Sequence, residues 1–176
     1  MQKYILTLAV LFMFCTRVSA QQVPPPSKGS PPPPSPIFTK ATSKVEIITR
    51  AISRMTYING SLDFLNKTTQ IINLPGNKTP SPVTIWRNES GQPVKISVAS
   101  SEVEVAADEY FFSNGKLFFA EERKIKYPIA ADKILFAISE DQKNNEVQSA
   151  DFEAVNFHIL NTVNAALTST KVGVKE

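Results

Sequence analysis

The apolar residues of this chain first recur at the spacing of an amphipathic helix. From position 43 onward they form a stripe of Val45, Ile48, Ile52 and Met55. Ser43 and Glu46 fit a capping box, in which the serine hydroxyl and the glutamate carboxylate each accept a backbone N–H at the helix start. Asn59-Gly60 is one predicted C-terminal end of this helix. Because the apolar phase continues beyond it, a helix that resumes or runs on to Ile72 is the alternative.

From Val83 the period changes to two, which predicts an antiparallel meander. Residues 83–87 and 94–98 form two predicted strands around a turn at 88–91. Two aromatic runs flank Asn114-Gly115, which favours a type I′ hairpin because both turn residues need positive φ. A further strand carries Ile134, Phe136 and Ile138 on one face, and a polar loop at 140–148 follows it.

The chain closes with a second predicted helix, which Ser149 caps. Its apolar stripe is Phe152, Val155, Ile159, Val163 and Ala166. The predicted fold class is therefore α+β, with an N-terminal helix, an antiparallel β-meander of about four to five strands and a C-terminal helix. We expect a single layer or a two-layer sandwich, formed by one domain over residues 41–172.

The aromatic hairpin is predicted to be apolar on both faces. A two-residue turn pairs Phe111 with Phe118 and places Tyr110 opposite Phe119. One interpretation is that a loop or the N-terminal segment covers the second face, so that all these rings are core. The other is that Phe111 and Phe118, together with Trp86, form an exposed patch that binds a partner or a sugar.

The first twenty residues have the pattern of a signal peptide, with Lys3 before an apolar run and small residues at its end. We expect cleavage between Ala20 and Gln21, export to the periplasm or the extracellular space, and no transmembrane segment afterwards. Residues 21–40 are rich in proline, which predicts a disordered, semi-rigid tether or spacer, or a ligand for another domain.

Cleavage of the signal peptide changes the net charge of the chain and removes its cysteine. Loss of Lys3 and Arg17 lowers the formal net charge from +3 to +1, which removes the main argument for a nucleic-acid partner. The only cysteine, Cys15, leaves as well, and with it any disulfide, thiolate nucleophile or cysteine metal site. His158 is the only histidine, and it is interpreted as a structural residue.

Carboxylates supply the remaining candidate chemistry. They gather around the base of the hairpin and comprise Glu102, Glu104, Asp108, Glu109, Glu121 and Glu122. The predicted register places Asp108 opposite Glu121, where the pair would bind Ca²⁺, act as an acid/base pair or simply form solvated strand ends. The sequence contains no nucleophile elbow and no phosphate-binding loop. No catalytic, metal-binding or cofactor-binding residue is assigned, and no cofactor is expected.

The stretch from Trp86 to Leu117, with its Glu109–Leu117 hairpin, resembles small exported bacterial proteins in which such a hairpin sits in an antiparallel meander. These proteins have no assigned activity, so the resemblance implies an exported meander and no site residues. The order of helix and meander is also similar to cystatin-like folds.

The expected function is a non-catalytic binding or envelope-associated module for an unidentified protein or glycan partner. A carboxylate-dependent hydrolase and an inhibitor of a secreted enzyme, which would present the Asn114-Gly115 turn, are the alternatives.

Overall fold

The computed structural model describes residues 43–99, 106–139 and 149–169. The predicted signal peptide, its cleavage site at Ala20 and Gln21, the proline-rich segment, Glu102, Glu104 and the loop at 140–148 lie outside these residues. In chain order the helices and strands are α1 (Lys44–Gly60), η1 (Leu62–Phe64), β1 (Asn66–Ile72), β2 (Ser81–Arg87), β3 (Pro93–Val98), β4 (Asp108–Ser113), β5 (Lys116–Glu122), β6 (Ile125–Ala130), β7 (Lys133–Ile134) and α2 (Ser149–Ser169).

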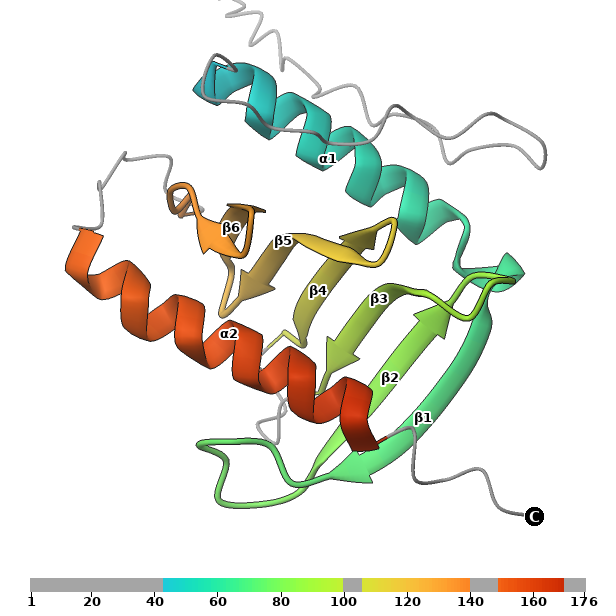
Figure 1. Ribbon diagram of the computed structural model, residues 1–176. Helices are drawn as coiled ribbons and strands as arrows, with labels where there is room; N and C mark the ends of the chain where they lie inside the picture. Colours follow the sequence, from blue (N-terminus) through green and yellow to red (C-terminus); the bar gives the residue numbers. More distant parts are fainter. Residues whose placement is uncertain (1–42, 100–105, 140–148, 170–176) are drawn as a thin grey trace, which may run out of the picture.

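The seven strands form one antiparallel meander whose spatial order is the chain order. Figure 1 shows α1 and α2 on opposite faces of this sheet. The α+β class with a helix at each end is therefore confirmed. The sheet has more strands than the four to five predicted, and the arrangement has three layers instead of one or two.

Helix α1 begins and ends where the sequence predicts. Ser43 is its N-cap, and the Ser43 hydroxyl accepts a hydrogen bond of 3.2 Å from the backbone N–H of Glu46. The helix ends at Gly60, so the prediction that it runs on to Ile72 is wrong. Residues 66–72 instead form β1, which pairs with β2 at every position. β-Branched residues are frequent in β1, and they favour a strand over a helix.

The predicted apolar stripe of α1 is only partly correct, because Met55 is buried and Ile48 is partly buried but Val45 and Ile52 are exposed. The helix buries a different stripe against the sheet, made of Ile47, Ala51, Met55 and Ile58. Val45 is 74% exposed and Ile52 is 47% exposed. The apolar residues of α1 form one broad face that contains both stripes, so helical periodicity alone does not choose between them, and packing against the sheet does.

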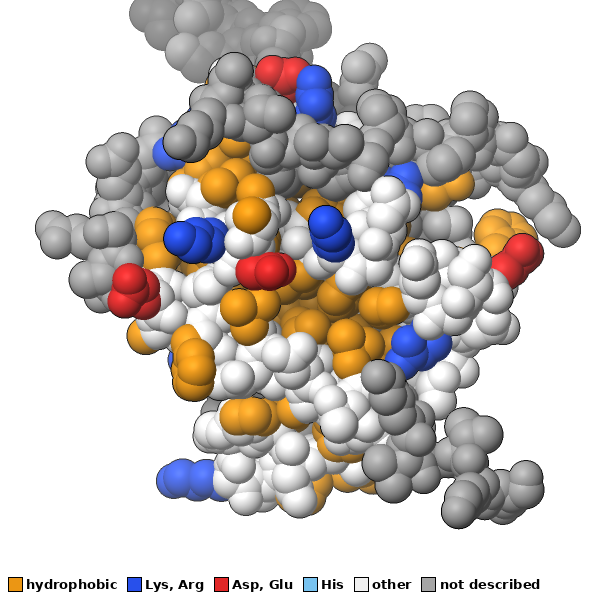
Figure 2. Space-filling view, in the orientation of Figure 1, with side chains coloured by type: hydrophobic (Ala, Val, Ile, Leu, Met, Phe, Trp, Pro, Cys, Tyr) orange, Lys and Arg blue, Asp and Glu red, His pale blue; other side chains and the backbone are white. Residues whose placement is uncertain are grey.

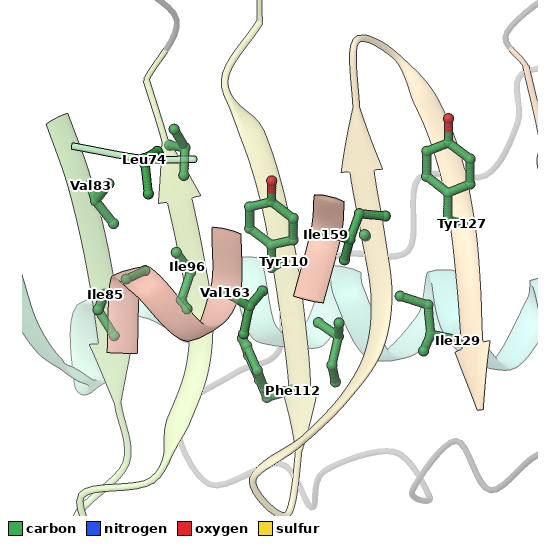
Figure 3. Packing of buried hydrophobic residues seen from close by; sticks show 14 residues of the cluster. Leu74, Val83, Ile85, Ile96, Tyr110, Phe112, Tyr127, Ile129, Ile159 and Val163 are labelled. Atoms are coloured by element: carbon green, nitrogen blue, oxygen red, sulfur yellow. The ribbon is translucent and has the colours of Figure 1, made fainter. Parts of the chain in front are cut away.

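Helix α2 packs against the other face of the sheet, as Figure 3 shows. Ile159, Val163 and Ala166 are buried there and Phe152 and Val155 are partly buried, which confirms the predicted stripe. The sheet contributes alternate residues from β2 to β6 to this core: Val83, Ile85, Ile96, Val98, Tyr110, Phe112, Leu117, Ala120, Tyr127 and Ile129. Neither α1 nor α2 has the length and apolar character needed to cross a membrane.

The β4–β5 hairpin contains a β-bulge that the sequence did not predict. Phe112 lies opposite Leu117, next to the turn, but Phe111 lies opposite Phe119 and not opposite Phe118 as predicted, which leaves Phe118 as an extra residue on β5. Phe118 and Phe119 therefore both contribute to the core beneath α1. The Phe111 and Phe119 rings meet edge to face, with 6.3 Å between their centroids.

The bulge changes every pair below it. Tyr110 lies opposite Ala120, and Glu109 lies opposite Glu121. The predicted pairs of Tyr110 with Phe119 and of Asp108 with Glu121 are therefore wrong. The physical reason is that one inserted residue shifts the remaining strand by one position and reverses the face of each side chain.

Strands β6 and β7 follow turns that carry no sequence signal. Asn114-Gly115 adopts positive φ at both residues, which confirms the predicted hairpin turn. The turns at Arg123-Lys124 and Ala131-Asp132 also have positive φ at both residues, although none of these is glycine. Strands β6 and β7 follow them, and only Ile134 of the predicted 134–138 strand lies in β7. Ile138 instead forms an isolated bridge with Lys126.

Truncation of Phe111 tests the importance of the core beneath α1. Phe111 is fully buried, so we expect Phe111→Ala to lower the free energy of unfolding by about 3–5 kcal/mol. The control is Val45→Ala on the outer side of α1, which should change it by no more than about 0.5 kcal/mol. Denaturant unfolding measures both, and equal effects would contradict this packing.

Candidate functional site

The predicted aromatic patch does not form. Phe111 is 0% exposed and Phe118 is 4% exposed, because α1 covers this part of the sheet. The interpretation that these two rings are exposed is therefore wrong, and the alternative, that the second face is covered and all the rings are core, is confirmed. The covering element is helix α1, not a loop or the segment before it. Of the three residues singled out for partner binding, only Trp86 keeps a partly exposed side chain.

Trp86 lies on the part of the α1 face that α1 leaves uncovered. The helix packs over β4 and β5 and contacts β6, whereas β1 and β2 extend beyond it. Strand register places alternate residues of β1, β2 and β3 on this face, and we call them the Trp86 surface: Lys67, Thr69, Ile71, Pro82, Thr84, Trp86 and Ser97. All are exposed or partly exposed.

Two ammonium groups hold the indole ring of Trp86 between neighbouring strands. Lys67 Nζ lies 5.7 Å from the ring centroid and Lys95 Nζ lies 5.6 Å from it. These distances are those of cation–π contacts, which favour this position of the ring. The Thr69 and Thr84 hydroxyls form a 3.0 Å hydrogen bond beside it. The surface therefore combines a fixed aromatic ring with hydroxyl and ammonium groups.

Lys95 is a buried cation at the boundary between this surface and α1. It is 5% exposed, and its Nζ lies 2.6 Å from a carboxylate oxygen of Glu109. It also donates a 2.8 Å hydrogen bond to Asn59 Oδ1 in the last turn of α1 and lies 5.1 Å from the Phe111 ring centroid. A buried charge needs such partners, because an unpaired one would be strongly destabilising.

A second cluster lies at the base of the hairpin on the α2 side. The Tyr110 hydroxyl donates a 2.7 Å hydrogen bond to Glu122, and His158 Nε2 lies 3.9 Å from the same carboxylate oxygen. Asp108 accepts a 3.1 Å hydrogen bond from the backbone N–H of Arg123. Figure 3 shows the Tyr110 and Tyr127 hydroxyls pointing toward the same end of the sheet.

Burial sets the protonation behaviour of this cluster. It raises the pKa of Glu122, and the hydrogen bond from Tyr110 and the nearby His158 oppose that rise. Burial also raises the pKa of Asp108, whereas the Arg123 backbone N–H opposes it. Burial also raises the pKa values of the Tyr110 and Tyr127 hydroxyls, and the nearby Glu122 carboxylate raises them further. Two partly dehydrated carboxyl groups therefore share one region with a histidine.

The sequence analysis singled out four residues of this cluster but did not predict the contacts among them. They are Asp108, Tyr110, Glu122 and His158. The predicted register placed Asp108 opposite Glu121, and the bulge instead turns Glu122 toward Tyr110. His158 joins them only because α2 returns across the sheet. No sequence spacing signals a contact between residues 36 positions apart on different elements.

Within residues 43–99, 106–139 and 149–169, no group of three or more histidine, cysteine or acidic side chains could hold a metal ion. Figure 2 shows the coloured lysine, arginine and acidic side chains scattered over the face in view, around a central group of hydrophobic side chains. The Asn114-Gly115 turn is exposed at the tip of its hairpin. Comparison of this chain with models of protein families, with curated proteins and with solved structures finds no match.

The raised pKa of Glu122 predicts a pH-dependent stability. The folded protein holds this proton to a higher pH than the unfolded chain does, so the free energy of unfolding falls as pH rises from the ordinary carboxyl pKa through the raised one. Glu122→Gln removes the ionisation and keeps an acceptor for Tyr110. We expect the variant to lose the part of this fall that Glu122 causes, to keep the part that the raised pKa of Asp108 causes, and to gain stability over the unsubstituted protein as pH rises.

Denaturant unfolding between about pH 3.5 and 7.5 measures the effect, a window around ordinary carboxyl pKa values. Glu89→Gln, in the exposed β2–β3 turn, is the matched control and should keep the original pH dependence. A Glu122→Gln curve parallel to that of the unsubstituted protein would show that Glu122 is not the responsible group.

Proposed function

We propose that this protein is an exported, non-catalytic binding module that contacts a protein or glycan partner through the Trp86 surface. The observation that carries the proposal is the partial cover of the sheet, since α1 buries Phe111 and Phe118 and leaves Trp86 partly exposed. The signal-peptide pattern supports export, and the proline-rich segment at 21–40 supports a tether that holds the domain away from its attachment point.

The composition of the Trp86 surface supports binding. Tryptophan is enriched among residues that dominate binding energy, because a large rigid ring buries much area at little cost in side-chain entropy. Lys67 and Lys95 already orient this ring, so less freedom is lost when a partner arrives. Hydroxyl groups of Thr69, Thr84 and Ser97 offer hydrogen bonds around it. Both peptides and sugars match such a surface.

Site-specific crosslinking tests the proposal because it captures a partner of any identity. A photoreactive phenylalanine analogue at Thr84 lies on the Trp86 surface, and the same analogue at Phe157, on α2, is the matched control. After illumination in the host envelope, we expect a discrete adduct from position 84 and none from position 157. Trp86→Ala should weaken adduct formation about tenfold or more, because loss of a binding hot spot costs that much affinity.

Two results would contradict the proposal. One is an adduct from position 157 alone, and the other is an adduct from position 84 that Trp86→Ala leaves unchanged. Digestion of the adduct with protease or with glycosidase then assigns the partner to one of the two classes. Circular dichroism of each variant confirms that it remains folded.

One observation favours a second candidate function, a carboxylate-dependent hydrolase. Glu122 has a raised pKa and lies beside His158, and perturbed carboxyl groups in contact with a second titratable group recur in active sites. A screen of glycoside and ester substrates with the unsubstituted protein and Glu122→Gln tests it. Activity that Glu122→Gln removes would support this function, and no activity in either would oppose it.

A further inference from the structure

The two edges of the sheet are built differently. At one edge β7 has only two residues, and the chain after it returns to bridge Lys126 through Ile138. At the other edge β1 has seven residues, contains no proline and pairs with β2 without a bulge. Proteins usually shorten, bend or cover an edge strand, because its free peptide groups bind other strands. Within the described residues, β1 has no neighbour on its outer side.

The hydrogen-bonding pattern identifies which peptide groups of β1 face outward. The carbonyl of Pro82 accepts a 2.9 Å hydrogen bond from Ala99 N–H, so the peptide groups of Pro82 face β3. Directions alternate along an antiparallel strand, so Val83 and Ile85 face β1. Their partners, Gln70 and Thr68, therefore bond to β2.

The outward residues of β1 are Lys67, Thr69 and Ile71. Each directs one N–H and one C=O to the edge of the sheet, where no strand of the described residues pairs with them. The side chains of the same three residues lie on the Trp86 surface.

We propose that β1 pairs antiparallel with β1 of a second copy of this chain, with Thr69 opposite Thr69 across a two-fold axis. The sheets of two copies then join into one continuous sheet. Each of the three outward residues of one copy exchanges an N–H and a C=O with the other copy. This inference is independent of the proposed function, because it rests on backbone direction and not on Trp86.

Charge supports a second copy as the occupant. Lys67 is the only charged residue of β1, and the two-fold register places it opposite Ile71 of the second copy. The two Lys67 residues are then about four positions, or about 13 Å, apart along the strand. This exceeds the Debye length of about 8 Å at physiological ionic strength, so their repulsion is screened.

The distribution of apolar side chains supports it as well. Ile71 is 73% exposed near one end of β1, and Phe64 is 58% exposed just before the other end. An antiparallel second copy brings the Phe64 end of one strand to the Ile71 end of the other. Two exposed apolar side chains thus gain apolar neighbours in this arrangement.

Proline scanning of β1 tests the proposal in the chain that starts at Gln21. Thr69→Pro removes an outward N–H and leaves the bonds to β2, whereas Thr68→Pro removes an N–H that bonds to β2. Thr69→Val keeps the N–H and removes only the hydroxyl. We expect a dimer for the unsubstituted protein and for Thr69→Val, and a self-association weakened about tenfold or more for Thr69→Pro.

Analytical ultracentrifugation over a range of concentrations measures self-association, and amide hydrogen exchange at Thr69 locates it. Slow exchange at Thr69 that weakens on dilution supports the proposal. A monomer at all concentrations overturns it, and so does a dimer that Thr69→Pro leaves intact. A monomer with a protected Thr69 amide also overturns it, because another part of the same chain then occupies the edge.

The Thr68→Pro variant separates loss of pairing from loss of folding. We expect it to lower the free energy of unfolding, while Thr69→Pro leaves that of the isolated monomer nearly unchanged. If Thr69→Pro is the variant that unfolds and Thr68→Pro is tolerated, the assigned direction of the β1 peptide groups is reversed and the proposed register is wrong.

Discussion

The β4–β5 hairpin is apolar on both faces, and a sheet with two apolar faces needs cover on both sides. On one face Tyr110, Phe112 and Leu117 pack beneath α2, and on the other Phe111, Phe118 and Phe119 pack beneath α1. The bulge at Phe118 places two consecutive rings on the α1 side. Each helix is thereby fixed over the centre of the sheet by the largest side chains available, since burial of aromatic area is the main source of stability in a domain without disulfides.

The same constraint determines what remains uncovered. Helix α1 has 17 residues, and its apolar stripe covers the aromatic half of its face of the sheet. The other half, over β1 and β2, carries Lys67, two threonines and Trp86, with Ile71 and Pro82 at one end. Lys95 lies where the two halves meet. Its ammonium group bonds to Asn59 at the end of α1 and to Glu109 on β4, and it contacts both Trp86 and Phe111. One buried cation therefore joins the core beneath the helix to the Trp86 surface.

Local chemistry allowed the sequence to predict the cap at Ser43, the end of α1 at Gly60, the Asn114-Gly115 turn and the stripe of α2. It did not predict features that depend on tertiary packing. The buried stripe of α1 competes with an equally apolar one, and the bulge at Phe118 follows from how the rings pack beneath the helix. The turn at Arg123-Lys124 uses residues that rarely adopt positive φ, and Pro128 argues against a strand at β6. The Glu122 cluster required both the bulge and the return of α2 before its members could meet.

The two ends of helix α1 adjoin different parts of the protein. The proline-rich segment is covalently joined to the Lys44 end of this helix, whereas Asn59 holds Lys95 and hence the Trp86 neighbourhood at the opposite end. A helix of 17 residues spans about 25 Å. In the proposed tethered arrangement, helix α1 therefore separates the attachment end of the domain from the Trp86 surface. A domain suspended by its N-terminus would present that surface at its far end, directed away from the structure to which it is attached.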